Sequence, residues 1–102
     1  MSGKVKITVL KSLVLEDLVE KYAAGPVELC GRMKPGDVYI TDGRSCPEGF
    51  CTWAWADIFK DILLVRQGAT CYTADKKGMV TACTDGFRPV IFLAEPYEES
   101  ES

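Results

Sequence analysis

Residues 4–10 read Lys-Val-Lys-Ile-Thr-Val-Leu, and polar and apolar side chains alternate along them as far as Val9. This alternation places Val5, Ile7 and Val9 on one face, which is typical of a strand that covers a core with one face and meets water with the other. We therefore expect the chain to begin with a half-buried strand.

Two amphipathic helices are expected after this strand. The first covers roughly residues 13–24, begins after the N-cap Ser12 and ends at Gly25-Pro26. The second covers about residues 53–66 and begins after Thr52, a good N-cap residue. Both have apolar residues at helical spacing: Leu15, Leu18, Val19 and Tyr22 in the first, and Trp55, Ile58, Phe59, Ile62 and Leu63 in the second.

The rest of the chain has the short apolar runs and turn residues of β-structure. Residues 27–30 and 38–40 are expected to form a hairpin around a turn at 34–37. A loop at 42–50 follows, and the later strands are expected at 70–73, 79–83 and 88–95, separated by turns at 75–78 and 84–87. Runs of strands interrupted by two helices predict an α+β fold, with a small, mainly antiparallel sheet and both helices packed on one face.

The composition predicts a single folded domain. The chain has 102 residues, of which 47% are hydrophobic and 26% are charged, and this balance excludes a disordered protein. Four of the 15 acidic residues lie in the last eight positions, which leaves 11 acidic against 12 basic residues elsewhere. We expect one α+β domain over residues 1–95 and a frayed acidic tail over 96–102.

Neither nucleic acid nor a membrane is an expected partner. No more than two basic residues are adjacent, so the sequence lacks the basic stripe that follows a phosphate backbone. The longest apolar runs are far shorter than the roughly 18 to 20 residues that cross a bilayer, and the N-terminus has no apolar signal core. We expect a cytoplasmic protein.

Five cysteines and no histidine limit the chemistry of the chain. Without imidazole, it cannot build a Ser-His-Asp triad, a Cys-His pair or a histidine general base. The odd number of cysteines and the absence of a C-x-x-C spacing argue against a secreted disulfide framework and a thioredoxin-like pair. Each reduced thiol is then a buried small side chain, a metal ligand or a reactive group.

Cys51 is the most informative single position, because it immediately precedes Thr52 at the start of the second helix. The positive end of the helix dipole would stabilise a thiolate there. Alternatively, Cys51 packs as an apolar neighbour of the cap. Trp55 fits the apolar stripe of the helix, so Trp53 is expected near Cys51, in a pocket wall or at a subunit interface.

Two turns carry the other candidate cysteines, Cys30 and Cys83. If these two converge with Cys51, they form a three-thiolate pocket suited to zinc or iron. The fourth ligand would then come from solvent, an Asp or Cys46. Asp85 and Arg88 are expected either to pair across their turn or to orient a ligand. Cys71 is expected in the core.

Three motifs, Gly36-Asp37, Gly49-Phe50-Cys51 and Cys83-Thr84-Asp85-Gly86-x-Arg88-Pro89-Val90, resemble a family of short prokaryotic conserved proteins of unknown function. The resemblance extends from Val5 to Glu95. It implies functional positions at Cys30, Gly36, Asp37, Cys51, Cys83, Asp85 and Pro89, and it implies no particular cofactor or substrate. Many relatives have Gly-His-Lys before the Gly-Asp, where this chain has Arg32-Met33-Lys34.

Three functions remain open from the sequence. The first is a pocket of Cys30, Cys51 and Cys83 that binds a metal ion or a small ligand, with Trp53, Asp85 and Arg88 as ligand-binding groups. The second is a thiol-dependent enzyme that uses Cys51. The third is a homo-oligomeric interaction module that associates through an exposed sheet edge and Trp53, and association is expected beside either of the other two.

Overall fold

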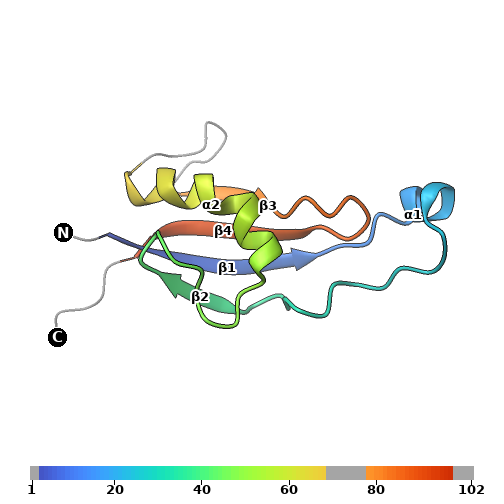
Figure 1. The fold of residues 1–102 in the computed structure, drawn as a ribbon, viewed down its shortest axis with the longest axis horizontal. Coiled ribbons are helices and arrows are strands. Elements are labelled where there is room, and N and C mark those ends of the chain that lie inside the picture. Colours follow the sequence, from blue (N-terminus) through green and yellow to red (C-terminus); the bar gives the residue numbers. More distant parts are fainter. Residues whose placement is uncertain (1–2, 69–77, 98–102) are drawn as a thin grey trace.

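The computed structural model describes residues 3–68 and 78–97. The elements in this part of the chain are β1 (Lys4–Ser12), α1 (Glu16–Tyr22), β2 (Val38–Thr41), α2 (Thr52–Arg66), β3 (Met79–Ala82) and β4 (Val90–Tyr97). The strands form a four-stranded sheet in the order β2-β1-β4-β3, and every neighbouring pair is antiparallel (Figure 1). The predicted α+β class is confirmed.

β1 is the half-buried strand that its alternation predicted. Val5, Ile7 and Val9 are buried, and the residues between them are only partly so. β1 pairs with β2 on one side and along nearly its whole length with β4 on the other. It therefore forms the centre of the sheet together with β4.

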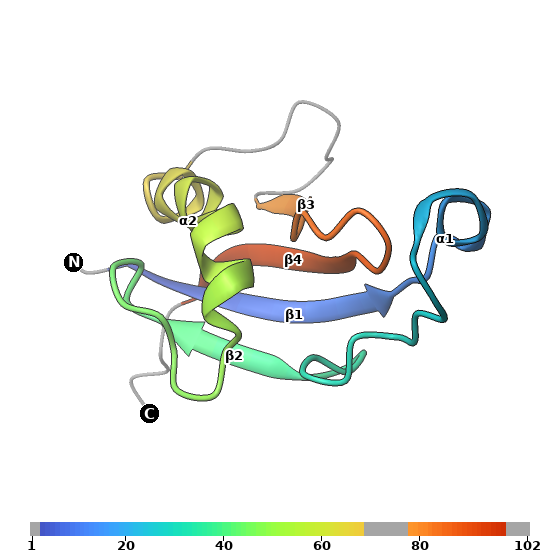
Figure 2. The same cartoon turned by 45° about the vertical axis from the view of Figure 1, so that its right-hand side comes forward.

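The hydrophobic core lies between α2 and one face of the sheet (Figure 2). Inward-facing side chains of the two central strands meet one side of the helix, and the loop before the helix adds Phe50. The buried apolar side chains are Val5, Ile7, Val9, Met33, Phe50, Ala54, Ile58, Ile62, Val65, Val90, Phe92 and Ala94. Phe50 and Phe92 link loop and sheet, with ring centroids 5.5 Å apart.

α2 differs from its prediction in its cap and in its buried stripe. Its N-cap is Cys51, not Thr52, and no side chain caps the helix. Its buried residues are Ala54, Ile58, Asp61, Ile62 and Val65, whereas Trp55, Phe59 and Leu63 are only half-buried. The polar Asp61 can be buried on this side of α2 because the Thr81 hydroxyl donates a 2.6 Å hydrogen bond to its carboxylate.

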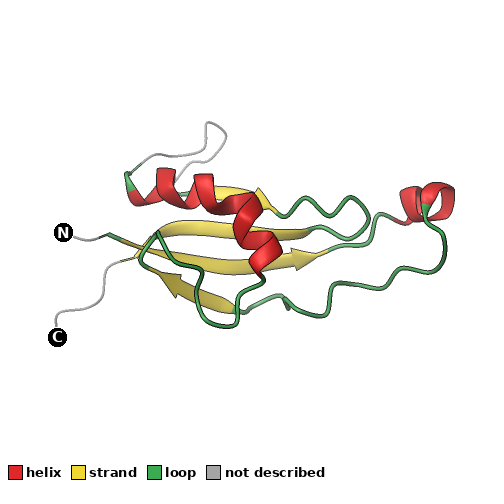
Figure 3. Cartoon of the chain, viewed as in Figure 1, coloured by secondary structure: helices red, strands yellow, loops and turns green. Residues whose placement is uncertain are grey.

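α1 is shorter than predicted and buries none of its residues. Ser12 belongs to β1 instead of capping the helix, and the backbone N–H groups of Leu13 and Leu15 donate hydrogen bonds to the carbonyls of Pro89 and Phe87. These bonds keep the chain extended before α1. The helix consequently lies beyond the end of β1, and of the two described helices only α2 covers the sheet face (Figure 3).

The predicted hairpin of residues 27–30 with 38–40 is wrong. Residues 27–30 form no strand, and β2 pairs with β1 instead. Backbone hydrogen bonds between Val9 and the turn residues Gly36 and Asp37 direct the chain onto β1. The predicted strand 70–73, with Cys71, and most of the turn at 75–78 lie outside the described residues.

The C-terminal half otherwise follows its prediction. β3 forms within the predicted 79–83, and the turn at 84–87 leads into the last strand. β4 continues to Tyr97, two residues past the predicted end of that strand, because Pro96 and Tyr97 still lie opposite Val5 and Lys4 of β1. Neither of the described helices is long and apolar enough to cross a bilayer.

Candidate functional site

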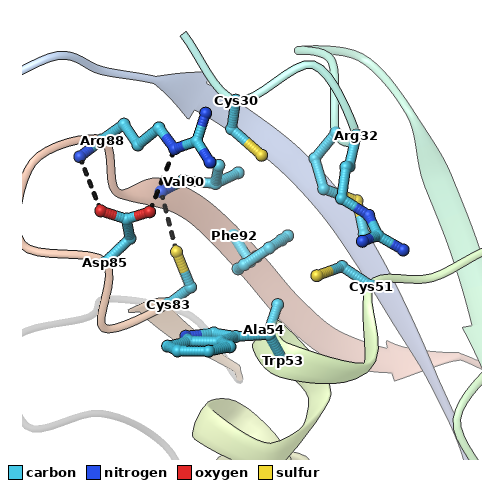
Figure 4. A pocket seen from close by; sticks show the side chains of 11 residues that line it. Cys30, Arg32, Cys51, Trp53, Ala54, Cys83, Asp85, Arg88, Val90 and Phe92 are labelled. Carbon is cyan, nitrogen blue, oxygen red and sulfur yellow. Dashed lines mark hydrogen bonds and ion pairs between the residues drawn. The ribbon is translucent and has the colours of Figure 1, made fainter. Parts of the chain in front are cut away.

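A cavity of about 270 Å³ opens where the N-terminus of α2 meets the turn after β3 and the irregular segment at residues 30–33 (Figure 4). Six residues that the sequence proposed for a pocket line this cavity, whereas Gly36, Asp37 and Pro89 do not. The six are Cys30, Cys51, Trp53, Cys83, Asp85 and Arg88, and they are joined by Arg32, Met33, Ala54, Val90 and Phe92. Segments more than 50 residues apart along the chain therefore form one concave surface.

The three candidate cysteines lie on three sides of this cavity. In Figure 4 the sulfur atoms of Cys30, Cys51 and Cys83 point toward the space that they surround. Cys51 is the N-cap of α2, and its carbonyl accepts the first helical hydrogen bond, from Trp55 N–H at 2.9 Å. The Cys83 Sγ accepts a 3.4 Å hydrogen bond from the N–H of Val90, which fixes that sulfur against β4.

The sulfur atoms surround the cavity without forming a coordination site. Within residues 3–68 and 78–97, no group of three or more His, Cys, Asp or Glu side chains is placed to hold a metal ion. A shared zinc would require each sulfur to lie about 2.3 Å from one point. The described side chains therefore do not provide the three-thiolate site predicted for zinc or iron.

Cys46, the predicted fourth ligand, does not line the cavity. Its thiol donates weak hydrogen bonds to the carbonyls of Pro47 and Phe50, both at 3.7 Å, and its side chain packs against the core. Burial, with a smaller effect of nearby Cys51, raises the pKa of the Cys46 thiol. Cys46 is therefore a protonated packing residue at neutral pH.

The turn after β3 holds one acidic and one basic side chain on the cavity wall. The Asp85 carboxylate accepts hydrogen bonds from the N–H groups of Phe87 and Arg88 and forms an ion pair with the Arg88 Nε at 3.2 Å. Partial burial raises the pKa of Asp85, but these hydrogen bonds outweigh it and hold that pKa below its ordinary value. The predicted pairing of Asp85 with Arg88 is confirmed.

Asp57 ties this turn to α2. Its carboxylate accepts a 2.8 Å hydrogen bond from the N–H of Thr84, 27 residues away along the chain. This contact makes Asp57 a positioning residue for the wall that carries Cys83, Asp85 and Arg88.

Trp53 and Trp55 point to different surroundings, as their spacing of two residues along α2 predicted. Trp55 is half-buried, and its ring lies 6.2 Å from Phe50 and 5.3 Å from Phe59, measured between centroids. Trp53 is 67% exposed and lies along the rim of the cavity (Figure 4). An exposed indole at a cavity mouth can cover the flat face of a bound molecule.

Arg32 is the site residue that sequence reasoning missed. It lines the cavity beside Cys51 (Figure 4), and its guanidinium forms no hydrogen bond or ion pair with any described residue. The neighbouring Met33 is 1% exposed and closes the cavity floor. Arg32 lies at the rim because the next residue, Met33, is buried. The residues around Arg32 in the sequence did not indicate this position.

The electrostatic balance of the cavity is positive. Two guanidinium groups, Arg32 and Arg88, lie on its wall, and Asp85 neutralises only Arg88. The backbone N–H groups of residues 52–54, in the first turn of α2, donate no hydrogen bond within the described part of the chain. Such free N–H groups at a helix start add partial positive charge.

Comparisons with known proteins neither confirm nor replace the resemblance seen in the sequence. No protein-family model matches the chain, and no significant match was found to a curated protein or to a solved structure. The inferences about the site therefore rest on its own geometry.

Proposed function

We propose that this protein binds a small anionic ligand in the cavity lined by Cys30, Cys51 and Cys83. The observation that carries the proposal is the meeting of Arg32, Arg88 and the start of α2 around one concave space. The Arg32 guanidinium has no partner among the described residues, and this favours an anion, because a charge-assisted hydrogen bond is stronger than a neutral one. A volume of about 270 Å³ suits a small metabolite.

The surrounding side chains have distinct roles in this proposal. Arg32 contacts the anionic group directly, and Asp85 holds Arg88 at the opposite wall. Trp53 covers the ligand from the rim, and the three thiols line the apolar interior with Phe92 and Val90. A cytoplasmic location would keep these thiols reduced.

Titration of the full chain with inorganic phosphate, sulfate and malonate tests the proposal. We expect at least one of these anions to bind and to change the fluorescence of Trp53, with the signal lost in Trp53→Phe. Arg32→Ala should weaken binding by about tenfold or more, as expected for a lost charge-assisted contact. The matched control is Arg44→Ala, an exposed arginine outside the cavity, which should leave binding unchanged.

Titration with zinc alone distinguishes metal binding from anion binding in this cavity. Tight, stoichiometric zinc binding that is abolished by Cys30→Ser, Cys51→Ser and Cys83→Ser individually, together with no anion binding, would overturn the anionic-ligand proposal. Zinc binding that survives these substitutions would leave it standing, since the metal would then lie elsewhere.

A second function is favoured by the position of Cys51. Cys51 is the N-cap of a 15-residue helix, and its side chain lines the cavity. We propose on this ground that Cys51 is the nucleophile if the bound ligand is chemically transformed. Iodoacetamide should then alkylate Cys51 faster than Cys30 and Cys83. Equal, slow labelling of all three would remove the enzymatic proposal and leave ligand binding intact.

A further inference from the structure

One face of the sheet has no cover among the described elements. We call it the open face, and it carries the side chains that alternate with the buried ones. A continuous row crosses all four strands on this face, from Val38 through Thr8 and Leu93 to Val80. Val80 and Val38 are 55% and 50% exposed, and Ile40 and Leu10 are exposed beside them. Exposed apolar side chains gathered on one face of a sheet mark an interaction site.

α1 is a helix that packs on no other described helix or strand. It has seven residues and buries none of them, although Leu18 and Tyr22 are apolar or aromatic. Leu29, in the segment that runs back beside α1, is exposed as well. An isolated helix this short is unstable in water, so a packing partner is needed to hold it.

The two surfaces carry opposite charges. Among its described residues, the open face presents Lys6 and Lys11 against one acidic residue, Glu95. α1 presents Glu16, Asp17 and Glu20 against one basic residue, Lys21. Opposite potentials across a contact set its orientation and exclude wrong partners. An acidic, apolar helix therefore complements a basic, apolar sheet face.

We infer that two copies of this chain form a symmetric dimer in which α1 of each copy packs on the open face of the other. One two-fold axis repeats the same contact twice, so both uncovered surfaces are covered by a single arrangement. Direct pairing of two open faces is disfavoured, because it would bring the lysines of β1 against each other. The dimer does not depend on the ligand pocket, which lies on the side of the sheet covered by α2.

Sedimentation velocity of the full chain tests this dimer over about 1 μM to 1 mM, a range that brackets weak interfaces. We expect a monomer–dimer equilibrium that Val80→Lys weakens by about tenfold or more, because a lysine there enters the apolar row. Val38→Lys, on a different strand, should have the same effect and guards against a folding defect in β3. Leu64→Lys is the matched control, since Leu64 is 44% exposed on α2, away from the open face.

Charge reversal separates this arrangement from other dimers. Glu16→Lys with Glu20→Lys in α1, or Lys6→Glu with Lys11→Glu in β1, should each weaken the dimer. All four substitutions together should restore it, because the complementarity returns with its signs exchanged. A chain that stays monomeric throughout the range would overturn the inference. A dimer indifferent to the α1 substitutions would also overturn it, because the contact would then use the open face or the sheet edge alone.

Discussion

The two helices show how far the same kind of sequence pattern can diverge in a folded chain. Both α1 and α2 have apolar residues at helical spacing, yet α2 buries five residues against the sheet and α1 buries none. The difference arises at their N-terminal ends. Phe50 anchors the start of α2 in the core, whereas the hydrogen bonds of Leu13 and Leu15 hold the chain extended past the end of the sheet before α1 begins. An apolar stripe thus predicts a helix without predicting what covers it.

The largest expected contrast comes from one truncation in each helix. Ile62→Ala in α2 should lower the free energy of unfolding by about 3 kcal/mol, because Ile62 is fully buried and its loss leaves a cavity. Leu18→Ala in α1 should lower it by less than about 1 kcal/mol in dilute, monomeric protein. Urea unfolding of the two variants measures both values, and equal losses would contradict the contrast between the helices.

The buried carboxylate of α2 provides the next contrast. Asp61→Ala should cost about 2 kcal/mol in the free energy of unfolding, because the Thr81 hydroxyl loses its 2.6 Å acceptor. Glu20→Ala in α1 is the counterpart and should stay within about 0.5 kcal/mol, as for other exposed sites. If Asp61→Ala were neutral, solvent would have to replace the contact, and α2 would be less closely packed than its burial indicates.

Acidification should weaken the turn that α2 holds in place. Because the pKa of Asp85 is lowered in the folded state, its contribution is fully present above the unfolded value of about 4 and is lost as the pH falls through the folded pKa. Asp85→Asn should therefore reduce stability by less than about 1 kcal/mol at pH 7, after solvent screening, and by almost nothing near pH 2. Unfolding curves across this range measure the difference. Asp17→Asn in α1 is the control and should leave the free energy of unfolding unchanged. If the loss of stability in Asp85→Asn grew as the pH fell, it would contradict the lowered pKa of Asp85.

The smallest effect is expected at Tyr22, an exposed aromatic residue of α1. Tyr22, at 69% exposure, should change the free energy of unfolding by less than about 0.5 kcal/mol when it is replaced by Ala in dilute protein. At high concentration the wild type should melt at a higher temperature than Tyr22→Ala, because association stabilises the folded state by mass action. Calorimetry at two protein concentrations measures this difference in melting temperature. A difference that is the same at both concentrations would place Tyr22 in the core of the monomer.

Local chemistry made much of the site predictable. The place of Cys51 at the start of α2, the turn around Asp85 and the outward direction of Trp53 each follow from neighbours within a few residues. Cys30 was placed in the site for a different reason from the one predicted. The hairpin expected to carry Cys30 does not form, and Cys30 lines the cavity together with the buried Met33. Arg32 and Asp57 were missed as site residues for the same reason: their roles depend on segments distant in sequence.

The sequence by itself determined the half-buried strand β1, the existence of α2 and the turn after β3, because alternation, helical spacing and turn residues act over a few positions. Only the tertiary structure decided that β2 pairs with β1, that α1 lies beyond the sheet and that Cys30, Cys51 and Cys83 line a cavity without forming a metal-binding group with other described side chains. These outcomes depend on pairing and packing between segments tens of residues apart. Such contacts are selected by the free energy of the whole core, which no local pattern encodes.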